Sequence, residues 1–234
     1  MTAPYRPHDA AEETDTTLLV IAKQPLPGRV KTRLVPPCTP GQAAVLAEAA
    51  LADTLHTVLA TPARRRVLVL DGEPGPWLPP GFDIAPQCAG GLDERLAGAF
   101  AAVPGPALLI GMDTPQLTPG LLRVDWAVAD AWFGPAADGG FWALGLRVPD
   151  PALVRGVPMS TAHTGASQRA RLHAAGLRVA DLPLLRDVDT AADAVAVARQ
   201  APWSRFAARA RELAPVLGPA AAGHQAGRAV REQV

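Results

Sequence analysis

The sequence predicts an α/β protein, a three-layer α/β/α domain built around a mostly parallel β-sheet. Short apolar runs that suit strands alternate with longer segments of helical periodicity through most of the 234 residues. Turns rich in glycine and proline separate these segments. Strand, loop and helix in regular alternation favour parallel strands joined by helices that cover both faces of the sheet.

The first predicted strand, at 18–22, is an unbroken apolar run that suits a buried position. Further strands are expected where similar runs recur between turns. The predicted strands cover residues 18–22, 67–70, 82–85, 107–110, a stretch from 132, 141–146 and 177–182. In a sheet of this kind ligands bind outside the carboxyl ends of the strands, so we expect the functional residues there.

Helices are predicted where apolar residues recur on one face. They cover residues 42–60, 91–103, 118–131, 166–175, a segment opened by 187–190, and 203–217. Thr118 followed by Pro119 is a typical helix start, and Thr190 with Asp193 resembles a capping box. In the last helix, Trp203 is expected on the packed side.

The length suits one large domain, predicted at 16–217, with a disordered arm at 1–15 and a disordered tail at 218–234. The 22 basic and 22 acidic residues balance, which argues against a nucleic-acid partner or a polybasic membrane surface. We expect no signal peptide and no run approaching the roughly 20 apolar residues of a membrane helix. The two cysteines are expected to be free thiols in the cytoplasm.

Four cations fall within eleven residues of the loop after the first strand: Lys23, Arg29, Lys31 and Arg33. The two lysines are the only ones in the chain, and an ammonium is a compact charge that suits phosphate. The loop matches neither a Walker A motif nor GxGxxG. A turn at Gly28 can still wrap a di- or triphosphate through side-chain charge and backbone N–H groups. The alternative is a solvated surface loop.

Asp113 directly follows the predicted strand at 107–110, where one carboxylate can hold Mg²⁺ against phosphate oxygens. Its alternative role is to cap a turn. Asp187 and Asp189 offer a second carboxylate, although acidic residues before a helix also favour the helix dipole.

Asp138 stands before Gly139 and Gly140, which let the backbone approach a ligand closely. Ser160 and Thr161 offer hydroxyl groups to an acceptor molecule. These residues can therefore meet a ligand or an acceptor molecule, the alternative for the first three being an ordinary turn between strands.

Several motifs together resemble a known bacterial family across residues 16–200: AKQPLPGRVKTRL, GGLDERL, GMDTPQL, GPAADGGFWALGL and DVDT. The family is "transferase 1, radical-SAM/selenodomain-associated", or DUF2064, of the nucleotide-diphospho-sugar transferase (GT-A) superfamily. The first and last motifs also resemble guanylyltransferases that activate phospholactate or phosphoenolpyruvate.

The resemblance implies roles for individual residues. Lys31 and Arg33 match positions that contact phosphates, and Asp113 matches a metal-binding aspartate. Asp189 matches a second metal carboxylate, with Asp187 as its neighbouring candidate. Gly139 and Gly140 match glycines that line the acceptor pocket, to which we also assign Asp138, Ser160 and Thr161. Apart from the resemblance, we expect four further residues to bind nucleotide or phosphate: Lys23, Gly28, Gln87 and Arg95.

These features together predict a transferase that depends on Mg²⁺ or Mn²⁺, with Lys31, Arg33 and Asp113 as its catalytic residues. We favour nucleotidyl transfer from an NTP to a small acceptor bearing phosphate or carboxylate, because the cation-rich loop suits a triphosphate. Glycosyl transfer from an NDP-sugar is the alternative. A nucleotide-binding protein without catalysis is a third, since Phe141 and Trp142 replace two tyrosines of the family pattern.

Overall fold

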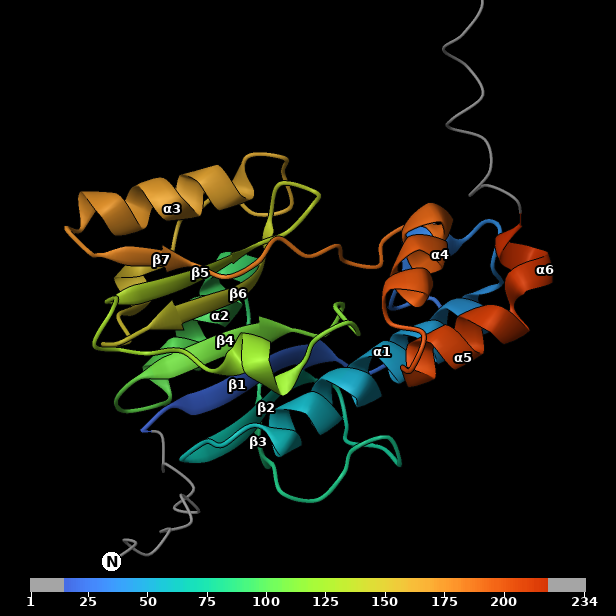
Figure 1. Cartoon of the computed structure of the whole chain (residues 1–234), viewed down its shortest axis with the longest axis horizontal. Coiled ribbons are helices and arrows are strands. Elements are labelled where there is room, and N and C mark those ends of the chain that lie inside the picture. Colours follow the sequence, from blue (N-terminus) through green and yellow to red (C-terminus); the bar gives the residue numbers. More distant parts are fainter. Residues whose placement is uncertain (1–14, 219–234) are drawn as a thin grey trace, which may run out of the picture.

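The computed structural model describes residues 15–218, so the arm predicted at 1–15 and the tail predicted at 218–234 lie outside the described residues, except for residues 15 and 218 themselves. Its centre is a seven-stranded sheet of order β3-β2-β1-β4-β6-β5-β7 (Figure 1). The strands are β1 (Thr17–Lys23), β2 (Arg65–Asp71), β3 (Asp83–Pro86), β4 (Ala107–Gly111), β5 (Ala131–Pro135), β6 (Phe141–Leu146) and β7 (Val179–Asp181).

The sheet is mostly parallel, as predicted. β1 pairs in parallel with β2 and β4, and parallel pairs also join β2 to β3 and β5 to β7. β6 is the exception, because it runs antiparallel to both β4 and β5. The carboxyl ends of β1, β2 and β4 therefore meet at one edge of the sheet, and the β5–β6 turn reaches the same edge.

Helices cover both faces, which confirms the three-layer architecture. The α-helices are α1 (Pro40–Ala60), α2 (Leu92–Ala101), α3 (Thr164–Ala174), α4 (Ala191–Gln200), α5 (Arg205–Glu212) and α6 (Ala214–Leu217). Short 3-10 turns are η1 (Thr32–Leu34), η2 (Pro119–Leu122) and η3 (Pro151–Leu153). Leu18 and Val20 of β1 pack with α1, whereas Leu19 between them packs with α2. This is the alternation expected of a strand buried on both faces.

The last helices extend the α1 layer beyond the sheet (Figure 1). Leu46 of α1 packs in one buried cluster with Val197 of α4 and Phe206 of α5. Asp53 of α1, 8% exposed, accepts hydrogen bonds from the backbone N–H groups of Arg205 and Phe206 at 3.0 and 2.8 Å. The carboxylate thus caps the start of α5.

α1 does meet the length and hydropathy criteria of a membrane span, although the sequence suggested that no segment would. Its 18-residue window of mean hydropathy 1.4 is, however, 61% buried inside the structure. Burial of this extent is typical of a core helix in a globular domain.

Two predicted helices are wrong. At 118–131 the chain forms only the 3-10 turn η2, because Thr118 makes no capping bond and Asp125 instead accepts the N–H of Ala127 in a local turn. The helix predicted at 203–217 is two helices, since Pro215 cannot continue α5. Trp203 precedes the first of them and is 68% exposed rather than packed.

Candidate functional site

A cavity of about 900 Å³ opens at the sheet edge where the parallel strands end. We call it the central cavity. Its walls come from the loop after β1, the start of α2, the loop after β4, the β5–β6 turn, the segment before α3 and the segment between β7 and α4. Its charged lining residues are Lys23, Arg29, Lys31, Arg33, Arg95, Asp113, Asp138, Asp187 and Asp189. Phosphate-loop and metal candidates from distant parts of the chain therefore share one space.

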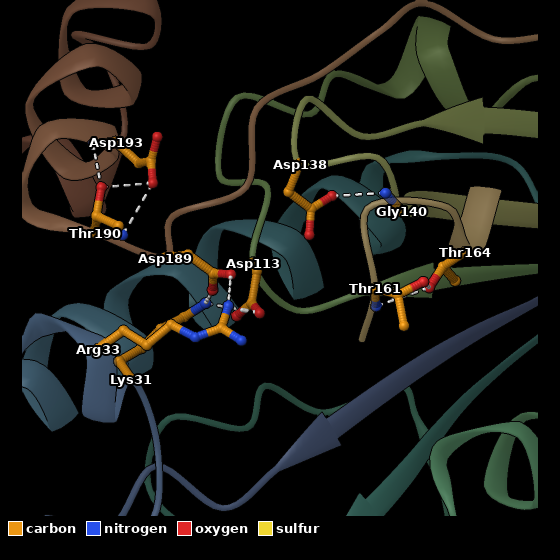
Figure 2. A network of polar contacts seen from close by, with 10 residues as sticks. All are labelled: Lys31, Arg33, Asp113, Asp138, Gly140, Thr161, Thr164, Asp189, Thr190 and Asp193. Carbon is orange, nitrogen blue, oxygen red and sulfur yellow. Dashed lines mark hydrogen bonds and ion pairs between the residues drawn. The ribbon is translucent and has the colours of Figure 1, made fainter. Parts of the chain in front are cut away.

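Lys31 lies at the centre of this charge cluster. Its side chain is 7% exposed, and its Nζ lies 2.7 Å from Asp113 Oδ2 and 3.3 Å from Asp189 Oδ1 (Figure 2). Arg33 Nη1 approaches Asp189 Oδ2 at 2.7 Å. A left-handed backbone at Lys31, with φ 49°, turns the loop into η1. Lys31 and Arg33 thus hold the first loop against the carboxylates of Asp113 and Asp189.

The electrostatic balance at Lys31 favours its charged form. Burial of the ammonium group by itself lowers the pKa of Lys31, but the charges of Asp113 and Asp189 outweigh that effect and raise it. The lysine is consequently a permanent cation of the site.

Asp187 lies in an unfavourable place for a charged carboxylate. Burial, followed by the charges of Asp138 and Asp113, raises the pKa of Asp187 to about 7. The backbone N–H of Val188 donates to Asp113 O at 3.1 Å, which ties this segment to the loop after β4. Four carboxylates line the cavity, and of its five cationic lining residues Lys31 and Arg33 form ion pairs with two of them, Asp113 and Asp189.

The carboxylates fit a divalent cation as partner. Oδ1 of Asp113 and Oδ1 of Asp187 are both buried without a hydrogen-bond partner. Within residues 15–218, no group of three or more His, Cys, Asp or Glu side chains is arranged to hold a metal ion by itself. Mg²⁺ commonly takes one or two protein carboxylates together with substrate phosphates, so such a preformed group is not required.

The predicted acceptor residues lie on two loops that touch each other. Asp138 Oδ1 accepts the N–H of Gly140 at 2.8 Å, and Thr161 N donates to Thr164 Oγ1 at 3.1 Å (Figure 2). Gly139 has φ +91°, and a Cβ there would lie 2.2 Å from Ala162 O. Glycine is therefore required at 139 to let the two loops meet.

The remaining nucleotide-binding candidates divide into lining and supporting residues. Gln87 donates to Ala22 O and Val69 O, and Arg95 donates to Asp71 and Gln87, so both line the cavity while bracing its wall. Lys23 lines the cavity and is exposed. Gly28 and Gly139 are not among the described lining residues; each serves the backbone turn beside it.

Sequence reasoning missed several residues at the site. Met112 and Leu92 line the cavity without having been predicted to, whereas Arg29, which also lines it, was one of the four cations noted in the first loop. Asp71, at the carboxyl end of β2, pairs with Arg95 at 3.1 Å. Its position directly after an apolar strand is the same signal that pointed to Asp113.

Comparisons with known proteins agree with this fold. A structure from Desulfovibrio desulfuricans G20, provisionally named a nucleotide-diphospho-sugar transferase, is 27% identical with TM-score 0.78, over 87% of this chain and 97% of that one. CMP:2-keto-3-deoxy-manno-octonic acid synthetase complexed with CTP is 14% identical with TM-score 0.50, over 86% of this chain and 100% of that one. The second likeness concerns the fold alone.

No curated protein matches this chain significantly. The predicted relation to guanylyltransferases stays a prediction. The family described as "Uncharacterized protein conserved in bacteria (DUF2064)" matches residues 45–161, which is half of the sequence. This match includes Asp113, the β5–β6 turn, and Ser160 and Thr161, so the predicted acceptor residues fall within it. The chain therefore belongs to the DUF2064 family.

Proposed function

We propose that this protein is a divalent-cation-dependent transferase that uses an activated nucleotide, in a single domain at 16–217. The observation that carries the proposal is the contact of Lys31 with both Asp113 and Asp189 inside the central cavity. At this place a cation that can bind phosphate lies within hydrogen-bond distance of carboxylates that can bind a metal. The D. desulfuricans structure, by its provisional name, agrees with a nucleotide-linked transfer.

The cations would bind the phosphates of the nucleotide. Lys31 and Arg33 carry charge at the centre of the cavity, and Arg33 is 67% exposed and accessible to a ligand. Asp113, Asp187 and Asp189 would hold the cation, which when bound supplies further neutralisation of phosphate charge. Stabilisation of this kind supports phosphoryl chemistry without a covalent enzyme intermediate.

Nucleotidyl transfer is the reaction that we favour. An acceptor oxygen would form a bond to the α-phosphorus while the bond to the pyrophosphate oxygen breaks, so that pyrophosphate leaves. The loop with four cations suits a triphosphate, and the loop after β4 carries a single aspartate, Asp113, rather than an Asp-x-Asp pair. The acceptor, which we propose bears phosphate or carboxylate, would lie between Asp138 and Thr161.

The test supplies Mn²⁺ or Mg²⁺ with each NTP or with NDP-sugars, and follows the release of pyrophosphate or NDP. We expect pyrophosphate from an NTP, and a loss of 100-fold or more in Asp113→Asn. Asp181→Asn serves as the matched control, because Asp181 is an exposed aspartate paired with Arg169 and does not line the described cavity.

Glycosyl transfer is the second candidate, favoured by the provisional name of the 27% identical structure. Release of NDP from a sugar donor, with no pyrophosphate from any NTP, would select it over nucleotidyl transfer. Nucleotide binding that is independent of metal and unchanged in Asp113→Ala would instead select a binding protein without catalysis.

We also propose a cytoplasmic location. Cys38 and Cys88 are both free thiols, as expected in a reducing compartment.

A further inference from the structure

Gln116 connects two segments of the cavity that are far apart in the sequence. It follows Asp113 by three positions and is 8% exposed. Its Nε2 donates a hydrogen bond of 2.7 Å to the carbonyl oxygen of Arg186, 70 residues further along the chain. A buried amide thus spans from the loop after β4 to the segment that carries Asp187 and Asp189.

The bond from Gln116 is one of two that flank Asp187. Gln116 holds the carbonyl group directly before Asp187, and Asp113 O accepts the N–H of Val188 directly after it at 3.1 Å. The two bonds join the same pair of segments. Together they determine how far the Asp187 backbone lies from Asp113.

An external restraint is needed at this place because like charges gather there. Asp113, Asp138, Asp187 and Asp189 all line one cavity, and mutual repulsion would drive the segment between β7 and α4 outward. Lys31 opposes this between Asp113 and Asp189, and Arg33 adds a second contact with Asp189, but neither cation pairs with Asp187. The structure shows no cation bonded to Asp187 among the described residues.

We propose that Gln116 is a positioning residue: its hydrogen bond to Arg186 O holds the segment that carries Asp187 and Asp189 against the loop that carries Asp113. This inference rests on the proposed function, since it concerns the carboxylates that would hold the divalent ion. Gln116 touches no ligand itself. Its contribution is to keep the carboxylates together against their repulsion, so that a cation finds them already placed.

The chain offers a closely matched control in Gln168. It is also buried, at 0% exposure, and its Nε2 donates to a backbone carbonyl, Leu153 O, at 2.8 Å. In both glutamines Oε1 is buried without a hydrogen-bond partner. Neither glutamine lines the central cavity, and Gln168 joins α3 to η3, so the two side chains differ mainly in what they connect.

The experiment compares Gln116→Met with Gln168→Met in the full chain. Methionine keeps the length of the side chain but cannot donate, so each variant leaves one buried carbonyl without its donor. We measure the dissociation constant of Mn²⁺ alone by calorimetry, urea unfolding, and amide hydrogen exchange at Val188. We expect similar losses of stability in both variants. Mn²⁺ binding should weaken 10-fold or more, and Val188 exchange rise 10-fold or more, in Gln116→Met only.

The inference is overturned if Gln116→Met binds Mn²⁺ within twofold of the unmodified protein, or if Gln168→Met weakens it equally. If the unmodified protein binds Mn²⁺ neither alone nor together with a nucleotide, the cation part of the proposed function fails, and exchange at Val188 alone decides whether Gln116 holds the segment. Should Gln116→Met not fold, Gln116→Asn replaces it, because its amide is one methylene too short to reach Arg186 O.

Discussion

Replacement of Lys31 by methionine should tighten the binding of a divalent cation and weaken the binding of a nucleotide. The Lys31 ammonium lies 2.7 Å from Asp113 Oδ2 and 3.3 Å from Asp189 Oδ1, where it neutralises the carboxylates that a metal would use. Methionine keeps much of the side-chain length without the charge. One substitution therefore removes a competitor of the metal and a partner of the phosphate.

The size of both changes in affinity can be estimated from the charges involved and from the exposure of the carboxylates. The side chains of Asp113 and Asp189 are 36% and 30% exposed, so we use the screening of water rather than that of a protein interior. A unit charge and a divalent ion about 4 Å apart then repel by about 2 kcal/mol, or roughly 30-fold in affinity. Loss of a charge-assisted hydrogen bond to phosphate costs about 1.5–3 kcal/mol, or roughly 10- to 150-fold.

Calorimetry with Mn²⁺ alone and with a nucleotide alone measures the two effects separately. Lys23→Met is the control, since it removes the same charge from the same cavity, and Lys23 forms no ion pair with any residue in the described range 15–218. We expect its Mn²⁺ affinity to change less than threefold. A folded Lys31→Met protein with unchanged or weaker Mn²⁺ binding would refute the idea that Lys31 competes with the metal for these carboxylates.

Three further predictions concern stability. In the presence of EDTA, the free energy of unfolding should fall by about 2–3 kcal/mol between pH 5 and pH 8, because Asp187, with a pKa raised to about 7, holds its proton longer in the folded than in the unfolded chain. Urea unfolding of Asp187→Asn should lack this fall, and an identical pH slope would contradict the assignment. Asp53→Ala should destabilise the protein by about 2–4 kcal/mol, since it leaves the N–H groups of Arg205 and Phe206 without their acceptor. Calorimetric melting would measure this loss of stability. An unchanged nucleotide affinity would show that the substitution affects only the start of α5. Gly139→Ala should cost about 2 kcal/mol more than Gly156→Ala, because a Cβ at 139 would meet Ala162 O at 2.2 Å whereas nothing lies within 4 Å at 156. Equal melting temperatures of these two variants would show that the β5–β6 turn adapts.

Local features of the structure followed directly from the sequence. The capping box of Thr190 and Asp193 was predictable because its partners are three residues apart, and both of its bonds are present. The strand at 107–110 and the Asp113 that follows were predictable because an apolar run and the turn after it are local signals. The parallel-sheet rule then placed Asp113 and the first loop at one edge, as the structure shows.

Features that depend on distant contacts were not predictable. Thr118 and Pro119 gave a sound helix start, yet packing around η2 and the local turn at Asp125 ended the helix after one turn. The amphipathic pattern at 203–217 placed Trp203 on the packed side, but Ser204 caps α5 and leaves Trp203 exposed at 68%. The antiparallel course of β6 likewise depends on which strands lie beside it, and no local signal records that.

By itself, therefore, the sequence determined the α/β class, the order of the strands along the chain and the residue types at the carboxyl ends of the strands. Tertiary structure alone decided that Lys31 lies between Asp113 and Asp189, and that Gln116 donates its hydrogen bond to Arg186 O. The physical reason is the range of the interactions. Periodicity and capping act within a few residues, whereas an ion pair or a buried hydrogen bond depends on a separation in space that only the folded chain defines.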